Sequence, residues 1–214
     1  MRTLLDGTIL NIARPTLADA MRAATEIAQS RNLMIVSVKA DGRVLPHEAL
    51  EEPSEEADRY GEVVIATLPA AKVIAGSLRD AADSFERIME GQVGASRAIQ
   101  EGRTEEGLKQ LHPILASWQA VRTIVENSGE ILKIDLTRVG VPGIDAQAPV
   151  GACTASLASA LKELKAALAD QDWSRLGDIV GYDLDALARD WKMVLSALAD
   201  YVESLPRPER TGGT

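Results

Sequence analysis

Apolar residues from residue 69 onward recur at helical spacing, and this pattern constrains the fold more than any other feature of the chain. Between residues 74 and 88 the steps alternate between four and three, as in the seam of packed helices. The positions are Ile74, Leu78, Ala81, Phe85 and Ile88. Further stripes run from Leu108 through Trp118 to Val125, and from Leu157 to Leu168. Such stripes predict amphipathic helices that close on one common interior.

The segment 172–202 predicts the last part of this helical region. Asp172 is a natural N-cap, and Gly181 is predicted to end a short first helix. A longer apolar stripe from Leu184 through Trp191 to Val202 then predicts the closing helix of a bundle. Earlier, the glycines of 90–94 are predicted either to end a helix or to loosen it, and Pro113 predicts a kink or a local break. The prolines and glycines of 139–151 predict a loop.

The first 68 residues show a different pattern, with short apolar runs separated by turn residues. A strand or hairpin is predicted around Asp6-Gly7, and a helix is predicted after Thr16, which forms a capping-box-like start with Asp19. Asp41-Gly42 predicts a turn between two further strands, and the run 62–68 predicts another. The acidic segment 48–58 is predicted to be a solvated loop.

These patterns together predict an α+β fold in which a small N-terminal α/β module, ordered β-α-β-β-β, precedes an antiparallel helical bundle. The predicted domains are residues 1–68 for the module, 69–205 for the bundle and 206–214 for a flexible tail. Aromatic residues are only 3% of the 214 residues, so the core is expected to consist mainly of alanine, leucine, valine and isoleucine.

The formal net charge of −9 restricts the partners of the chain. Acidic proteins repel phosphate backbones and anionic lipid surfaces, so we expect neither nucleic-acid binding nor membrane binding. No apolar run approaches the roughly 20 residues that span a bilayer, and Asp6 and Gly7 interrupt the N-terminus too early for a signal peptide. The single cysteine agrees with a reducing compartment. We therefore expect a cytoplasmic protein.

Few residues in the sequence carry obvious chemistry. Cys153 follows a loop and opens a helix, a position that can activate a thiol, but it has no companion motif. His112 precedes a proline inside a predicted helix, and His47 lies at the edge of the acidic segment. One cysteine and two scattered histidines do not supply a zinc site. We predict no catalytic residue, no metal site and no cofactor.

The helical region resembles a known family in the stretches "ASRAIQEGRTEEGLKQLHPILASWQAVRTIV" and "LARDWKMVLSAL". The longer stretch is similar to the second and third helices of the flagellin export chaperones, and the shorter one is similar to their last helix. The resemblance spans residues 69–204 and is one of pattern. It implies a helical bundle that wraps the disordered end of a secreted subunit. The α/β module and the loop before Cys153 depart from that family.

The leading hypothesis is a non-catalytic binding or assembly protein, an adaptor that holds a protein or peptide segment in a helical groove. The residues predicted to bind this partner are Ile74, Leu78, Phe85, Trp118 and Trp191. Homodimerisation through the 74–88 seam is a competing use of the same surface. The alternatives are a regulatory protein that binds a small ligand and a purely structural oligomeric subunit.

Overall fold

The computed structural model describes residues 1–140 and 149–206. It confirms the predicted α+β class, with an N-terminal sheet followed by a helical bundle. The chain divides into a sheet unit, which contains Met1–Val73, and a helical unit, Ile74–Ser204. Most of the predicted tail and residues 141–148 of the predicted loop lie outside the described residues. Pro69, the first residue of the predicted bundle, is the last residue of a strand.

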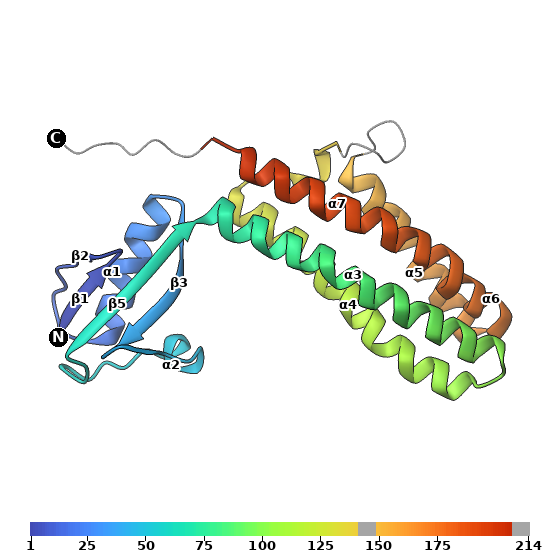
Figure 1. Ribbon diagram of the computed structural model, residues 1–214, viewed down its shortest axis with the longest axis horizontal. Helices are drawn as coiled ribbons and strands as arrows, with labels where there is room; N and C mark the ends of the chain where they lie inside the picture. Colours follow the sequence, from blue (N-terminus) through green and yellow to red (C-terminus); the bar gives the residue numbers. More distant parts are fainter. Residues whose placement is uncertain (141–148, 207–214) are drawn as a thin grey trace. The chain divides into compact units, whose positions relative to one another are not determined.

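The sheet unit contains one five-stranded mixed sheet in the order β2-β1-β5-β3-β4 (Figure 1). Its strands are β1 (Arg2–Leu5), β2 (Thr8–Ile9), β3 (Leu33–Ala40), β4 (Arg43–Val44) and β5 (Glu62–Pro69). The central strand β5 runs parallel to β1 and antiparallel to β3. Helix α1 (Leu17–Ser30) follows β2, so the order is β-β-α-β-β-α-β: of the two alternatives at Asp6-Gly7 the hairpin forms, and a second helix absent from the predicted β-α-β-β-β order precedes β5. The prediction that the acidic segment 48–58 is a loop is partly wrong, because this segment contains a short helix, α2 (Glu48–Glu51).

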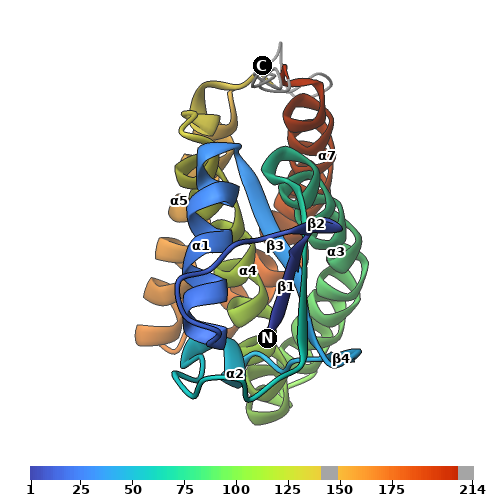
Figure 2. The ribbon, with the colours of Figure 1, turned by 90° about the vertical axis from the view of Figure 1, so that its left-hand side faces the viewer.

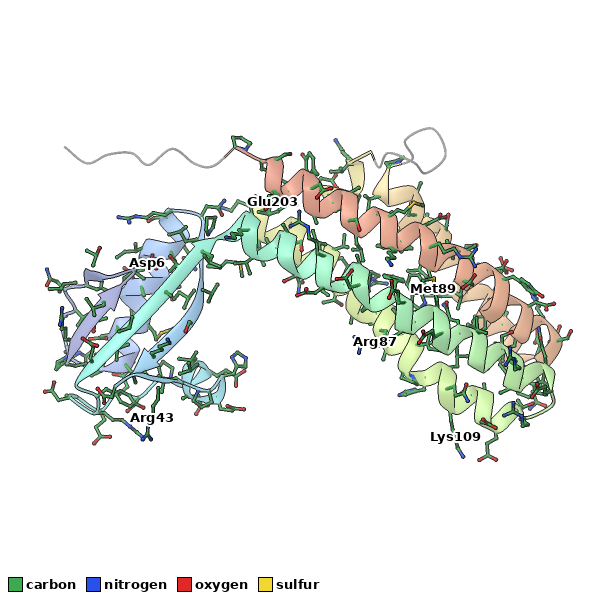
Figure 3. The ribbon with its side chains drawn as sticks, in the orientation of Figure 1. Asp6, Arg43, Arg87, Met89, Lys109 and Glu203 are labelled. Carbon is green, nitrogen blue, oxygen red and sulfur yellow. The ribbon has the colours of Figure 1, made fainter. Side chains whose placement is uncertain are left out.

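Two Asp-Gly turns form the hairpins at the edges of the sheet. Asp6 and Gly7 have φ of +49° and +79°, and Asp41 and Gly42 have φ of +48° and +79°. Positive φ at both central residues defines the turn that matches strand twist, and Asp-Gly suits it. Each aspartate also binds β5. Asp6, labelled in Figure 3, accepts hydrogen bonds from the N–H (2.7 Å) and hydroxyl (2.6 Å) of Thr67. Asp41 accepts one from the N–H of Glu62 (2.8 Å).

Helix α1 packs against one face of this sheet (Figure 2). The Thr16 hydroxyl accepts a hydrogen bond from the Asp19 N–H at 3.1 Å, which is half of the predicted capping box. The buried core between helix and sheet is small: Leu5, Leu17, Ala24, Val38, Ala40, Val63 and Ile65. Its strand residues alternate along the strands, as expected for a sheet with one covered face.

The helical unit is built from long helices, which run alongside one another, and a short helix (Figure 1). The long helices are α3 (Ala70–Gln100), α4 (Thr104–Leu132), α5 (Val150–Ala169) and α7 (Leu184–Ser204), and the short helix is α6 (Trp173–Asp178). A 3-10 turn, η1 (Leu136–Arg138), follows α4, and a π-helical turn, η2 (Ile179–Asp183), joins α6 to α7. Helix α4 continues through Pro113, so the local break that this proline predicted as an alternative to a kink does not occur.

The glycines of 90–94 do not end α3, which continues to Gln100. They allow α4 to approach instead. A Cβ at Gly91 would lie 3.2 Å from the Ile114 side chain, and one at Gly94 would lie 3.0 Å from Oε1 of Gln110. The smallest residue at each position therefore serves helix packing.

The predicted helix end at Gly181 is also wrong, because residues 173–204 form one uninterrupted helical run with the π turn inside it. A π turn shifts the backbone hydrogen bonds by one residue and leaves a carbonyl without its usual partner. The Ser96 hydroxyl of α3 donates to the Gly177 carbonyl at 2.8 Å. A Cβ at Gly181 would lie 2.5 Å from Oγ of Ser96, so this glycine permits the close approach.

Candidate functional site

The five residues predicted to bind a partner lie in the interior of the helical unit. Ile74, Leu78, Phe85, Trp118 and Trp191 are each at most 4% exposed. The Phe85 and Trp118 rings meet edge to face with centroids 5.0 Å apart, and those of Trp118 and Trp191 do so at 6.3 Å. These contacts are typical of a core. We therefore correct the prediction: the five side chains form no exposed binding surface.

The 74–88 seam, predicted as an alternative homodimer surface, is likewise closed. Ala81 and Ile88 are buried together with the three seam residues above. Residues that this chain already covers cannot pair with a second copy while the bundle remains folded.

A pocket of about 360 Å³ lies in the helical unit beside the end of α4. Its wall comes from residues 122–137, which include the last turns of α4 and η1, and from Thr154 of α5 and Trp191 of α7. Trp191 is thus the one predicted partner residue that reaches this pocket. Because the volume falls within the range of ligand sites, about 300–1,000 Å³, we take this pocket as the candidate functional site.

A tight reversal at the end of α4 shapes the wall of the pocket. Lys133 has a left-handed backbone, with φ of +56°, and the N–H of Ile134 donates to the Gly129 carbonyl at 3.0 Å. A Cβ at Gly129 would lie 2.9 Å from the Ile134 carbonyl oxygen, so glycine is required for this close approach. The reversal brings Leu136, which is buried, back toward the bundle.

The rim of the pocket carries charges of both signs. Nε of Arg122 lies 2.9 Å from Oε1 of Glu126, one turn along α4. Asp135 accepts hydrogen bonds from the hydroxyl and N–H of Thr137 and pairs with Arg138 at 3.0 Å. The Thr137 hydroxyl, followed by its N–H and Arg138, lowers the pKa of the Asp135 carboxyl. This rim residue therefore stays anionic to lower pH than an ordinary aspartate.

The inner wall is apolar. Val125, Leu136 and Trp191 are buried side chains that contribute to it. The indole N–H groups of Trp191 and Trp118 have no hydrogen-bond partner among residues 1–140 and 149–206. An apolar wall below a charged rim suits a ligand with an apolar body and a polar end.

The residues that the sequence singled out for chemistry are dispersed. Cys153 is buried, and burial, followed by the charge of Asp190, raises the pKa of its thiol, which favours the less reactive protonated form. His112 is exposed, and exposed His47 lies 3.2 Å from Glu51. Within the described part of the chain, no group of three histidine, cysteine, aspartate or glutamate side chains is arranged to hold a metal.

Sequence reasoning missed most of the pocket, because its wall comes from a segment with no repeating pattern. Two local signals exist. Gly129 stands near a helix end, and Asp135 precedes Thr137 by two residues, a spacing typical of a capped turn. Both signals indicate a chain reversal, but neither indicates a cavity.

Comparisons with known proteins give no relative. No family model, no curated protein and no solved structure matches the chain. In the parts of the chain that are described, no helix is both long enough and apolar enough to cross a membrane.

Proposed function

We propose that the protein is a non-catalytic binding protein of the cytoplasm that holds a partner segment at the pocket beside Trp191. The observation that carries this proposal is the pocket itself, with an apolar inner wall formed by Val125, Leu136 and Trp191 and a rim formed by Arg122 and Glu126. An amphipathic segment presents the matching pattern, because it carries an apolar anchor and flanking charges of both signs.

The finer proposal concerns the class of the partner. The pattern resemblance of residues 69–204 to flagellin export chaperones suggests the terminal segment of a secreted flagellar subunit as the client. One apolar side chain of that segment would occupy the pocket, and its neighbours would meet the charged rim.

The test is a calorimetric titration of the full chain with terminal peptides of secreted flagellar subunits from its own host. Trp191 lines the pocket, so its fluorescence should change on binding. Thr154→Phe places a ring in the pocket wall and should weaken binding by at least about tenfold, which corresponds to about 1.4 kcal/mol. The Thr154 hydroxyl bonds only within its own helix, to the Val150 carbonyl, so the change should leave the fold intact.

Thr123→Phe is the matched control. Thr123 is an exposed residue of α4 whose hydroxyl also bonds within its helix, to the Gln119 carbonyl, and it does not line the pocket. It should bind as the wild type does. Equal loss of binding in both variants, or no binding of any such peptide to the folded chain, would refute the proposal.

A second candidate function is small-molecule binding. The pocket volume lies at the lower end of the range for such ligands, which favours it. A metabolite that raises the melting temperature of the wild type and of Thr123→Phe, but not of Thr154→Phe, would support this alternative over the peptide.

A further inference from the structure

The sheet unit has an apolar face that no described element of that unit covers. The strand register places one residue from each strand in a row across the sheet: Ile9, Leu4, Val64, Lys39 and Val44. Their chain neighbours Leu5, Val38, Ala40, Val63 and Ile65 point to the core below α1. Because side chains alternate along a strand, the row lies on the opposite face. We call this side of the sheet the open face.

The open face is rich in exposed apolar side chains. Ile9 is 61% exposed and Val44 is 66% exposed. Leu68 is in register with Met34 and lies four residues after Val64 on β5. Residues an even number of positions apart share a face of the sheet, so Leu68 extends the open face. Val36 lies at a bulge next to Ile35, which packs against the core, and therefore points to the open face as well. All four strongly exposed apolar residues of the sheet unit thus share one side.

The row that defines the open face contains one charged side chain, and that side chain is a base. Lys39 occupies the row between Val64 and Val44, and among the described residues no carboxylate lies within ion-pair distance of it. Arg2 and Glu62, one row away, pair with each other at 3.6 Å. The face therefore offers an unmatched ammonium group within apolar surroundings, on a chain whose net charge is −9.

The dimensions of the face suit one helix. On the covered side, α1 has 14 residues, a length of about 21 Å. The eight residues of β5 extend about 26 Å. Addition of a partner strand is disfavoured, because the edge strands β2 and β4 have two residues each.

A second copy of the chain is a poor occupant. Five strands spaced about 4.8 Å apart, of which two are short, give a face on the order of 400 Å², half of the roughly 800 Å² per partner in stable complexes. Two such faces in contact would also bring both Lys39 ammonium groups to the same interface. We propose that the open face binds an amphipathic helix of a partner protein, about four turns long, with carboxylates beside its apolar stripe.

The test uses two synthetic 16-residue helical peptides and the full ¹⁵N-labelled chain. Both peptides carry leucines on one stripe, and one has glutamates on both flanks where the other has lysines. The glutamate peptide should bind at least about fivefold more tightly at low salt, with amide shift changes in β2, β3, β4 and β5. Lys39→Glu should reverse the order of the two affinities.

Apolar contacts are tested separately from charge. The double variant Val36→Ser/Val44→Ser should weaken binding of the glutamate peptide at least about fivefold. The matched control is Val93→Ser, because Val93 is a similarly exposed valine (48%) on α3 in the helical unit, and it should bind as the wild type does. The proposal would be overturned if Lys39→Glu left the ratio of the two peptide affinities unchanged. It would also be overturned if the amide shift changes on peptide binding were confined to the helical unit.

Other occupants give distinct results. If Val36→Cys in the free chain resists modification by a maleimide, another part of the chain already covers the face and the proposal fails. Buried Cys153 provides the internal reference for a protected thiol.

A second copy and a membrane are tested by separate measurements. If the chain forms a concentration-dependent dimer and Val44→Ser dissociates it, the open face binds a second copy. Binding to phosphatidylserine vesicles but to neither peptide would assign it to a membrane. The pocket beside Trp191 takes no part in these measurements, so the two proposals stand or fall independently.

Discussion

Phe85 and Val44 are both large apolar residues in regular elements, yet Phe85 is fully buried whereas Val44 is 66% exposed. The difference follows from the architecture of the two units. In the helical unit, apolar stripes of several helices face one another and close the interior. In the sheet unit, α1 and Leu50 of the short helix α2 pack against one face of a sheet that has two faces. An apolar pattern shows which side of an element avoids water, but the number of packed layers decides whether that side is covered.

The largest effect should come from opening the closed core. Phe85→Ala removes a fully buried ring that contacts Trp118 edge to face, and it should destabilise the helical unit by about 3–5 kcal/mol. All three tryptophans lie in the helical unit, so tryptophan fluorescence during urea unfolding measures this unit alone.

The control is Val93→Ala, an exposed position on the same helix, which should change stability by less than about 0.5 kcal/mol. Amide signals of β1, β3 and β5 should persist at urea concentrations that unfold the Phe85→Ala bundle. A loss of both units in one transition would show that the two units unfold cooperatively.

The contact between Ser96 and the π turn should give the next largest effect. Gly181→Ala brings a methyl group into Oγ of Ser96 and should cost about 1–3 kcal/mol. Ser96→Ala alone should cost about 1–2 kcal/mol, because the Gly177 carbonyl loses its donor. The double variant should be more stable than the sum of the two losses predicts, as measured by urea denaturation. Strict additivity would contradict direct contact at this point.

In the sheet unit, the corresponding test is Asp6→Ala. It removes two hydrogen bonds to Thr67 and places alanine at positive φ, so it should destabilise the sheet unit by about 2 kcal/mol. The matched control is Asp6→Asn, which tolerates this backbone and keeps an acceptor oxygen, and it should lose less than half as much. Amide exchange in β1 and β5 measures the effect, and unchanged exchange would contradict it.

Features that neighbouring residues determine could be predicted from the sequence, whereas features that depend on residues far apart in the chain could not. Asp6-Gly7 and Asp41-Gly42 determine their turns through adjacent residues, so the second hairpin was predicted and the first was one of two predicted alternatives. The helical periodicity after residue 69 is also local. The role of Gly181 was mispredicted, because it depends on Ser96 in another helix, and the Ser96 to Gly177 hydrogen bond spans 81 residues. The stripe through Trp118 predicted a helix that closes on a common interior, and Trp118 is buried there, so its separate assignment to a partner surface was wrong.

The closed core contains one residue that should oppose its stability. Gln92 is fully buried, and neither its amide nitrogen nor its oxygen has a partner among the described residues. Unpaired buried polar groups are costly, so Gln92→Met, which keeps the volume and shape, should stabilise the helical unit by about 1 kcal/mol. Urea denaturation followed by tryptophan fluorescence measures this, with exposed Gln119→Met as the neutral control. Destabilisation would show that Gln92 is satisfied, for example by an internal water.

The smallest effect should come from the outer surface of the helical unit, where Lys192 of α7 lies 2.8 Å from Glu86 of α3. The hydrogen bond to Lys192, together with its positive charge, lowers the pKa of the Glu86 carboxyl. A carboxyl whose pKa is lower in the folded state stabilises the fold above its unfolded pKa, about 4.3 for glutamate. That contribution is lost as the pH falls through the folded pKa. The wild type should therefore exceed Glu86→Gln slightly in stability at neutral pH and low salt, and the difference should vanish in acid and shrink in salt. If the stability difference between the wild type and Glu86→Gln grew toward acid pH, the assigned pair would be contradicted. Phe85→Ala is the control, because its loss of stability involves no charge and should remain nearly constant over the same pH range.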